Sequence, residues 1–280
     1  MPDIEDGAAL PGTSQRGDVV FRHRLSTRLW HWTNAVVFFV MLMSGLMIFN
    51  AHPRLYWGQY GANPDSAWLE IGSEGQHGYL RIGELAIDTT GVLGLWADQN
   101  DLHARAFPSG ATIPSSYNLA LARHWHLTFA WLFAGGLVLY GIWSLVNGHL
   151  KRDLAPRPAE LKPGHIFQDI KAHATLKLPK GGAARDYNTL QKLAYLGVLG
   201  LLLPVMILAG LAMSPAMDAA WPWLLDLFGG RQSARSIHFI AAFLLVLFVL
   251  VHLAMVVLAG PFNEIRSMIT GRYRLPKEKP

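Results

Sequence analysis

The chain has 280 residues, of which 51% are hydrophobic and only 15% are charged. This composition excludes an ordinary soluble domain and makes the lipid bilayer the expected solvent. The formal net charge is +5 and cysteine is absent, which excludes disulfides, thiolate metal sites, iron–sulfur clusters and thioether-attached haem. Any metal must therefore be bound by histidine, methionine or oxygen ligands.

The start of the chain, MPDIEDGAALPGTSQRGD, is polar and lacks the basic flank and short apolar core of a cleavable signal peptide, so the first apolar run is expected to remain as a helix. Four stretches are apolar for roughly 20 residues, the length that crosses ~30 Å of hydrocarbon. We expect an all-α integral membrane four-helix bundle, a single domain over 1–280, with helices over residues 30–49, 127–146, 193–213 and 237–259.

The connections between these helices differ in character. Residues 50–122 contain Trp57, Trp68, Trp96 and many glycines, so we expect a folded outer cap that offers a docking surface. Residues 147–189 form a basic loop with one amphipathic segment, HIFQDIKAHATL, suited to the membrane surface. Pro204 predicts a kink in the third helix.

The positive charges indicate the orientation of the chain in the membrane. Four arginines precede the first helix, eight Lys or Arg lie between Lys151 and Arg185, and five follow the fourth helix. The outer connections have three arginines before the second helix and two before the fourth. The positive-inside rule places both termini and the 147–189 loop in the cytoplasm of a bacterium and the other loops in the periplasm. We therefore interpret the basic charge as a membrane signal and expect no nucleic-acid partner.

The fourth helix carries two histidines fourteen residues apart, His238 and His252. Fourteen residues return a helical side chain to within about 40° of its starting direction, about 21 Å along the axis. His31 lies at the inner start of the first helix and His126 at the outer start of the second, so the topology predicts the pairs His31–His252 and His126–His238. Paired imidazoles bind haem iron from both sides and leave no position for substrate, which favours electron transfer. His124 is the competing ligand on the second helix.

Three further residues are candidates for contacts with a haem. Gly45 lies fourteen residues beyond His31 and would let a flat macrocycle approach the first helix, although simple helix packing explains it equally well. Arg28 and Arg235 each precede a proposed ligand by three residues and would pair with haem propionates, although snorkelling to lipid headgroups is the ordinary explanation for each.

The segments HRLSTRLWHWTN, ARHWHLTFAWLF, DYNTLQKLAYLGV, the SIHF…VH pair and MITGRYRL together resemble the four-helix cytochrome b family. That family includes the membrane subunits of formate dehydrogenases and nickel–iron hydrogenases, and this chain is most similar to the thiosulfate reductase cytochrome b type. The resemblance implies two b-type haems. His31 and His252 would bind the inner haem, and His126 and His238 would bind the outer one. It also implies electron exchange in the bacterial inner membrane between quinone and a periplasmic oxidoreductase, frequently a molybdenum enzyme. By position, Asn147, His149, Asn188 and Gln191 are candidates for hydrogen bonds to the quinone, although each also has the ordinary role of a polar residue at a helix end.

Three other functions are compatible with the same residues. The first is a transporter or channel without a cofactor, in which the histidines relay protons. The second is a haem-free anchor that holds a partner at the membrane. The third is a cytochrome that uses quinol to reduce ferric ions or oxygen without a partner subunit. A visible spectrum separates the first two from a cytochrome.

Overall fold

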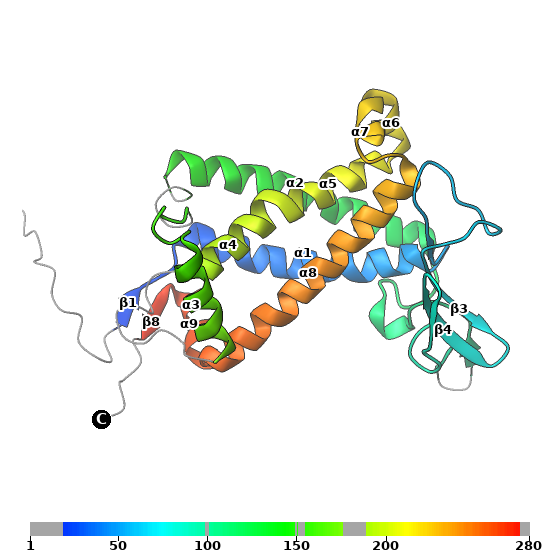
Figure 1. Cartoon of the computed structure of the whole chain (residues 1–280), viewed down its shortest axis with the longest axis horizontal. Helices are drawn as coiled ribbons and strands as arrows, with labels where there is room; N and C mark the ends of the chain where they lie inside the picture. Colours follow the sequence, from blue (N-terminus) through cyan, green and yellow to red (C-terminus); the bar gives the residue numbers. More distant parts are fainter. Residues whose placement is uncertain (1–18, 99–100, 149, 151–154, 176–188, 275–280) are drawn as a thin grey trace, which may run out of the picture.

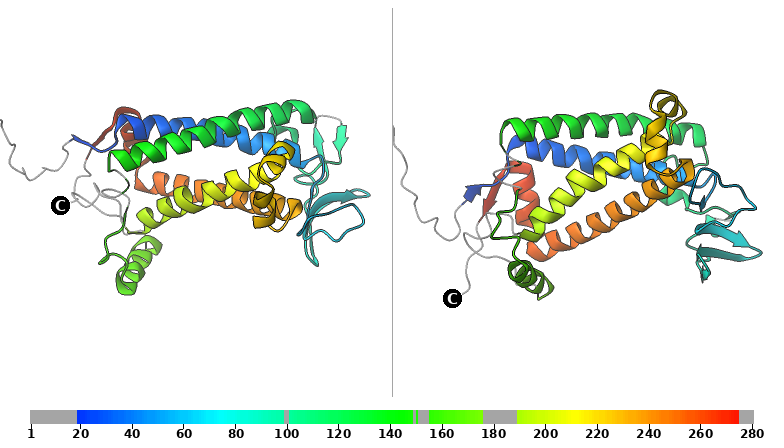
Figure 2. Two further views of the ribbon diagram at one scale, coloured as in Figure 1. Left: turned by 90° about the horizontal axis from the view of Figure 1, so that it is seen from above. Right: turned by 45° about the horizontal axis from the view of Figure 1, so that its top comes forward.

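The computed structural model describes residues 19–98, 101–148, 150, 155–175 and 189–274. Within these residues, four helical segments are long and apolar enough to cross a membrane, and they form an elongated bundle (Figure 1). The spans are α1 (Leu25–Phe49), α2 (Leu119–Val146), a third over Thr189–Ala212, and α8 (Arg231–Ala259). α1 packs along α2, and the second half of the third span packs along α8 (Figure 2).

The spans begin earlier than hydropathy alone predicts, because a helix continues to its cap rather than to the edge of the apolar run. α2 begins at Leu119 instead of residue 127 because Asn118 caps it, its side-chain oxygen accepting the backbone N–H of Leu121 at 2.9 Å. α8 begins directly after Gly230, whose φ of 111° suits a glycine. The extra turns carry polar residues at the ends of the spans.

The third span is interrupted in its middle. It consists of α4 (Thr189–Gly197), a π-helical turn η4 (Val198–Leu202) and α5 (Leu203–Ala212). Pro204 is the second residue after the π turn, and a proline lacks a backbone N–H and collides with the carbonyl four residues before it. The wider π turn accommodates this conflict, so the predicted irregularity occurs one turn before the proline.

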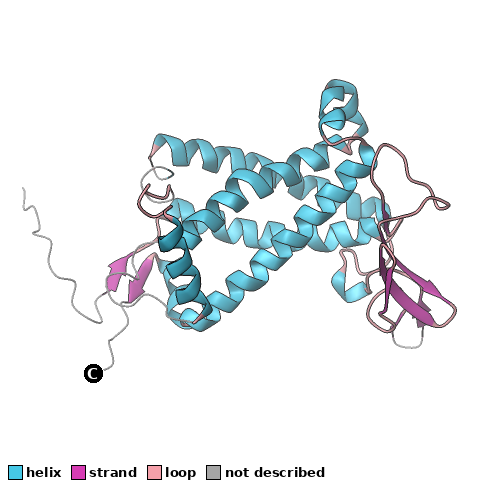
Figure 3. Cartoon of the chain, in the orientation of Figure 1, coloured by secondary structure: helices cyan, strands magenta, loops and turns pink. Residues whose placement is uncertain are grey.

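The outer segment is folded, but it consists of strands. β2 (Arg54–Leu55), β3 (Leu69–Glu74), β4 (His77–Ile82) and β5 (Leu85–Asp88) form an antiparallel sheet in that order. β6 (Trp96–Asp98) and β7 (Asp101–His103) form a hairpin, followed by the short helix η1 (Ser109–Ala111). The expectation of an all-α chain is therefore wrong for the cap (Figure 3). Buried Leu69 and Ile71 of β3 pack against Phe49 at the end of α1, so the sheet closes the outer end of the bundle.

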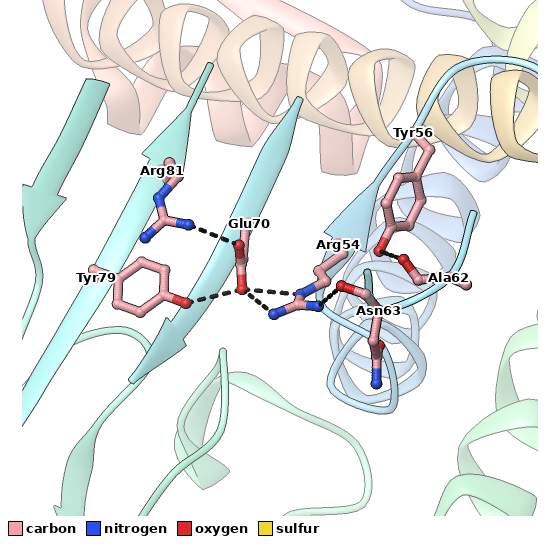
Figure 4. Close-up of polar contacts among 7 residues, drawn as sticks. All are labelled: Arg54, Tyr56, Ala62, Asn63, Glu70, Tyr79 and Arg81. Atoms are coloured by element: carbon pink, nitrogen blue, oxygen red, sulfur yellow. Dashed lines mark hydrogen bonds and ion pairs between the residues drawn. The ribbon is translucent and has the colours of Figure 1, made fainter. Parts of the chain in front are cut away.

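A buried carboxylate crosslinks the cap sheet (Figure 4). Glu70 accepts hydrogen bonds from Arg54 Nε at 2.9 Å, Tyr79 Oη at 2.8 Å and Arg81 Nη1 at 3.3 Å. Burial raises the pKa of Glu70, but the hydrogen bonds from Tyr79 and Arg54 and the charges of Arg54 and Arg81 outweigh burial and lower this pKa below its ordinary value. Glu70 therefore joins three strands as an ionised group.

The opposite end of the bundle is built from both terminal segments. β1 (Val19–Phe21) pairs with β8 (Arg272–Arg274), beside α9 (Pro261–Thr270), at the end opposite to the cap (Figure 1).

The predicted amphipathic segment forms α3 (Pro163–Ala174), with Phe167 and Ile170 exposed. The outer loop between α5 and α8 forms α6 (Pro215–Ala220) and α7 (Pro222–Leu227). An even number of spans places both terminal segments at the same end.

Candidate functional site

Four histidines meet in two pairs inside the bundle. The ring centroids of His31 and His252 are 6.1 Å apart, with an angle of 58° between the ring planes. The centroids of His126 and His238 are 6.2 Å apart, at 66°. α8 supplies one member of each pair, and α1 and α2 supply the other members.

These separations fit a metal held between two imidazoles. A metal–imidazole bond is about 2 Å long and the nitrogen is about 1 Å from the ring centre, so two ligands on opposite sides of one ion have centroids about 6 Å apart. In the described part of the chain, no group of three or more His, Asp or Glu converges on a common point. A metal at either pair therefore needs further ligands from its cofactor, as the four nitrogens of a porphyrin provide.

The outer pair is oriented by neighbouring backbone groups. His238 Nδ1 lies 2.9 Å from the carbonyl oxygen of Met206, and His126 Nδ1 lies 3.1 Å from that of Met41. Ser44 Oγ is also 3.1 Å from His126 Nδ1. An N–H at Nδ1 that donates to a carbonyl leaves the lone pair on Nε2 for a metal, the usual arrangement of a ligating histidine. At the inner pair, the buried Nδ1 of His31 has no hydrogen-bond partner within the described part of the chain.

Two glycines make room for the outer imidazoles. A Cβ atom on Gly45 would lie 3.3 Å from Cε1 of His126, and one on Gly210 would lie 3.2 Å from Cε1 of His238. Gly45 thus contacts a proposed ligand, whereas the sequence suggested a contact with the macrocycle. Gly210 was not predicted, because its partner His238 lies on another helix and no spacing along the chain relates the two.

A cavity of about 2670 Å³ runs between the helices and is lined by all four histidines and both glycines. Sites for single ligands usually have volumes of ~300–1,000 Å³, so this cavity has room for more than one large group. Its lining is mostly apolar side chains from the membrane spans and the cap sheet. An apolar cavity with paired imidazoles near each end suits flat hydrophobic cofactors.

The two predicted arginines differ in position. Arg235 lines the cavity and donates from Nη1 to the carbonyl oxygen of Arg54 at 3.1 Å and from Nη2 to that of His52. Its guanidinium also lies 5.5 Å from the centre of the Phe49 ring. Arg28 is not among the cavity-lining residues, and its Nη1 donates to the carbonyl oxygen of Ile269 at 2.7 Å. The geometry therefore gives no support to a contact between Arg28 and a propionate.

The structure describes only some of the remaining predicted residues. Asn147 is the C-terminal cap of α2 and is not among the cavity-lining residues, whereas Gln191 is. His149 and Asn188 lie outside the described residues. On the outer part of α2, His124 is exposed and does not line the cavity, whereas His126 does.

A membrane bundle in which α8 supplies one histidine to each of two pairs defines the chain as a membrane cytochrome b. The family model of prokaryotic cytochrome b561 matches residues 22–271, so the chain belongs to that family. It is a transmembrane electron-transfer protein of the cytochrome b561 type, and its family implies b-type haem.

Two curated relatives are similar to this chain. A protein of Azospira oryzae, assigned as protein-methionine-sulfoxide reductase subunit YedZ1, is 32% identical over 153 residues, which cover 54% of this chain and 71% of the relative. A protein of Cupriavidus necator, assigned as a Ni/Fe-hydrogenase B-type cytochrome subunit, is 21% identical over 286 aligned positions, which cover 98% of this chain and 93% of the relative. No solved structure matches the chain. Both relatives are named as subunits of oxidoreductases.

Proposed function

We propose that the chain is a di-haem b cytochrome of the bacterial inner membrane that carries electrons between the quinone pool and a periplasmic oxidoreductase. The observation that carries this proposal is the separation of 6.1 and 6.2 Å between the ring centroids of the two histidine pairs. His31 and His252 would hold the inner haem, and His126 and His238 the outer one. Bound haem supplies an iron that takes up and releases one electron at a time.

The protein itself sets the positions of the four histidines and the apolar surroundings of the two haem sites. α8 holds His238 and His252 fourteen residues apart, which separates the two sites by about 21 Å along the helix axis. The Met206 and Met41 carbonyls orient the outer imidazoles. The mostly apolar lining of the cavity disfavours water at both pairs, and two imidazoles per site would leave no iron position for substrate. These features favour electron transfer over catalysis at the metal.

The charges of the loops support the orientation, and the two relatives support the kind of partner. The positive-inside rule puts both termini in the cytoplasm, and this places the cap and the His126–His238 pair on the periplasmic side. The two relatives are named as subunits of a methionine-sulfoxide reductase and a hydrogenase, which supports a soluble oxidoreductase, of the molybdenum type or another, as the partner. Arg235, a half-buried cation that lines the cavity three residues before His238, is the candidate among the described residues for pairing with a haem propionate.

The test is the haem content of the purified chain and of two variants. A pyridine haemochrome assay is expected to give two b haems per chain. His252→Ala is expected to remove the inner haem and spare the outer one, and His238→Ala is expected to do the reverse. A colourless protein would favour a proton-relaying transporter or a haem-free anchor. One haem per chain, lost in either variant, would contradict the two-site arrangement.

A further inference from the structure

A polar cluster lies at the inner end of the cavity, where the two terminal segments of the chain meet the third span. Arg22 follows β1, Glu264 belongs to α9 and Tyr195 belongs to α4. All three line the cavity that also contains His31 and His252. Polar side chains that face an apolar cavity within a membrane protein usually have a ligand or a transport role.

The cluster is centred on a mostly buried ion pair. Arg22 Nη1 donates to both carboxylate oxygens of Glu264 at 3.3 Å, and the two side chains are only 14% and 19% exposed. The Arg22 guanidinium lies 4.5 Å from the centre of the Tyr273 ring. Arg22 Nε is buried and has no hydrogen-bond partner among the residues that the structure describes. Because a buried donor without a partner is costly, the free N–H favours a polar ligand in this part of the cavity.

The groups around the ion pair link it to the inner histidines. The charge of Glu264 acts on His252 and Tyr195, and that of Arg22 acts on Tyr195 and His23. Tyr273 also faces Glu264, and burial followed by the Glu264 charge raises the Tyr273 pKa. Burial and then the Arg22 charge lower the pKa of His23 to about 4, so His23 is neutral near pH 7. Among the residues that the structure describes, Glu264 is the only acidic residue that lines the cavity.

We propose that Arg22, Tyr195 and Glu264 form the site that binds the quinone headgroup and exchanges its protons. This inference rests on the proposed function, which supplies quinone as the redox partner. Arg22 Nε and the Tyr195 hydroxyl are hydrogen-bond donors for a quinone carbonyl, and the Glu264 carboxylate is the proton acceptor. The apolar cavity wall beside Ile265 and Met268 takes the hydrophobic tail.

In the direction of quinol oxidation, each O–H bond of the quinol breaks in the same way. The proton would move to the Glu264 carboxylate, and the electron would pass to the haem that His31 and His252 would hold. Two such events would convert quinol to quinone, provided that the first electron passes from the inner haem site to the outer one before the second arrives. The two protons would leave one after the other through Glu264 to the inner aqueous side. In quinone reduction Glu264 donates the same protons.

The sequence-based expectation put the quinone beside Asn147, His149, Asn188 and Gln191. Gln191 lies one turn before Tyr195 on α4 and lines the same cavity, so the proposed site differs from that part of the expectation which lies at the end of α2, beside Asn147 and His149. The full-length haem-loaded chain in lipid nanodiscs separates the two locations by photolabelling with an azidoquinone, displaced by decylubiquinone, and mass-spectrometric mapping of the labelled peptide. Label is expected on the peptides that contain Tyr195 or Glu264. Label on the peptide that contains Asn147 would overturn the proposal.

Three variants sharpen the test. Glu264→Gln is expected to slow haem reduction by decylubiquinol or menadiol about 100-fold, the usual effect of losing a general base, and to flatten the pH profile. Tyr195→Phe leaves the ion pair intact and is expected to weaken labelling about tenfold, as for one lost hydrogen bond. Glu160→Gln is the matched control, because Glu160 pairs with Lys192 at 2.9 Å on the same side of the membrane without lining the cavity. All three should keep the wild-type haem spectrum.

The outcomes separate this inference from the function on which it rests. If the unmodified chain is neither labelled nor reduced by either quinol, the proposed function itself fails. If the unmodified chain is labelled and reduced, but Glu264→Gln and Tyr195→Phe behave like Glu160→Gln, the cluster is not the quinone site. If these two variants alter the absorbance of the inner haem and leave quinone labelling intact, the cluster positions the haem, and the inference is wrong.

Discussion

Gly210 of α5 lies directly against the imidazole of His238 on α8, and a Cβ atom at Gly210 would be 3.2 Å from Cε1 of that ring. On the opposite wall, Gly45 of α1 has the same relation to His126 at 3.3 Å. Contacts this close are tighter than a Cβ atom normally makes with a ring. Each outer imidazole is therefore held between a glycine of a neighbouring helix and the space in which a cofactor would lie.

Larger side chains at these glycines are expected to disturb the outer site alone. Gly210→Val should push the His238 ring toward its partner and lower the haem content from two to one per chain, because the neighbouring helix backbone cannot move away without loss of packing. Gly45→Val should act on His126 in the same way. Haem stoichiometry and the reduced-minus-oxidised spectrum measure the effect.

The control for these substitutions is Gly135→Val on α2, since a Cβ atom there meets no heavy atom within 4 Å. It changes the helix propensity as the other two substitutions do and leaves both histidine pairs untouched. Equal haem loss in all three variants would show that the damage comes from the helix and not from the imidazoles.

His124 and His126 are expected to differ sharply when each is replaced by alanine. His126→Ala should remove the outer haem because its ring faces His238, whereas His124→Ala should retain two haems because its side chain is exposed outside the cavity. The pyridine haemochrome assay of the two variants decides between them. Loss of haem in His124→Ala with retention in His126→Ala would reverse the assignment.

Much of the membrane part could be predicted because its signals are local. A run of apolar residues predicts a span from its own length, and two histidines fourteen residues apart on one helix share a face whatever surrounds them. The pairing with His31 and His126 needs only the alternating direction of successive spans. These inferences use the periodicity of the helix and the thickness of the bilayer, and neither depends on tertiary packing.

The rest depends on contacts between distant segments. Arg22 and Glu264 are 242 residues apart and meet because β1 pairs with β8. Arg28 has the sequence position of a propionate partner, but the same pairing brings the Ile269 carbonyl within its reach. The cap strands are short and interrupted by glycines, so their alternation is too weak to distinguish a sheet from irregular structure. Tertiary contacts decide these features.

Arg235 connects the cap to α8, and its removal is expected to loosen that connection. Arg235→Met deletes the donors to the carbonyl oxygens of His52 and Arg54 and leaves these acceptors unsatisfied, at a cost of about 1–3 kcal/mol. Hydrogen exchange in the cap segment around Arg54 should become faster while exchange along α2 stays unchanged. Arg235→Lys keeps the charge but not both hydrogen bonds. Its rate of hydrogen exchange around Arg54 should therefore lie between those of the unmodified chain and of Arg235→Met.

The last prediction concerns the pH dependence of the cap. Glu70 has a pKa below its ordinary value of 4.5 because hydrogen bonds and neighbouring arginines outweigh burial, so its ionised form stabilises the fold. The unfolded chain takes up a proton first as the pH falls, and this stabilisation is therefore complete above about pH 4.5 and lost as the pH falls through the folded pKa. Glu70→Gln should destabilise the cap by about 1–3 kcal/mol at neutral pH, and the difference in apparent Tm from the unmodified chain should shrink below pH 4.5. Asp65→Asn, at an exposed carboxylate of the same cap, is the control. A difference in Tm that stays constant down to pH 3 would mean that Glu70 acts through its shape and not through its charge.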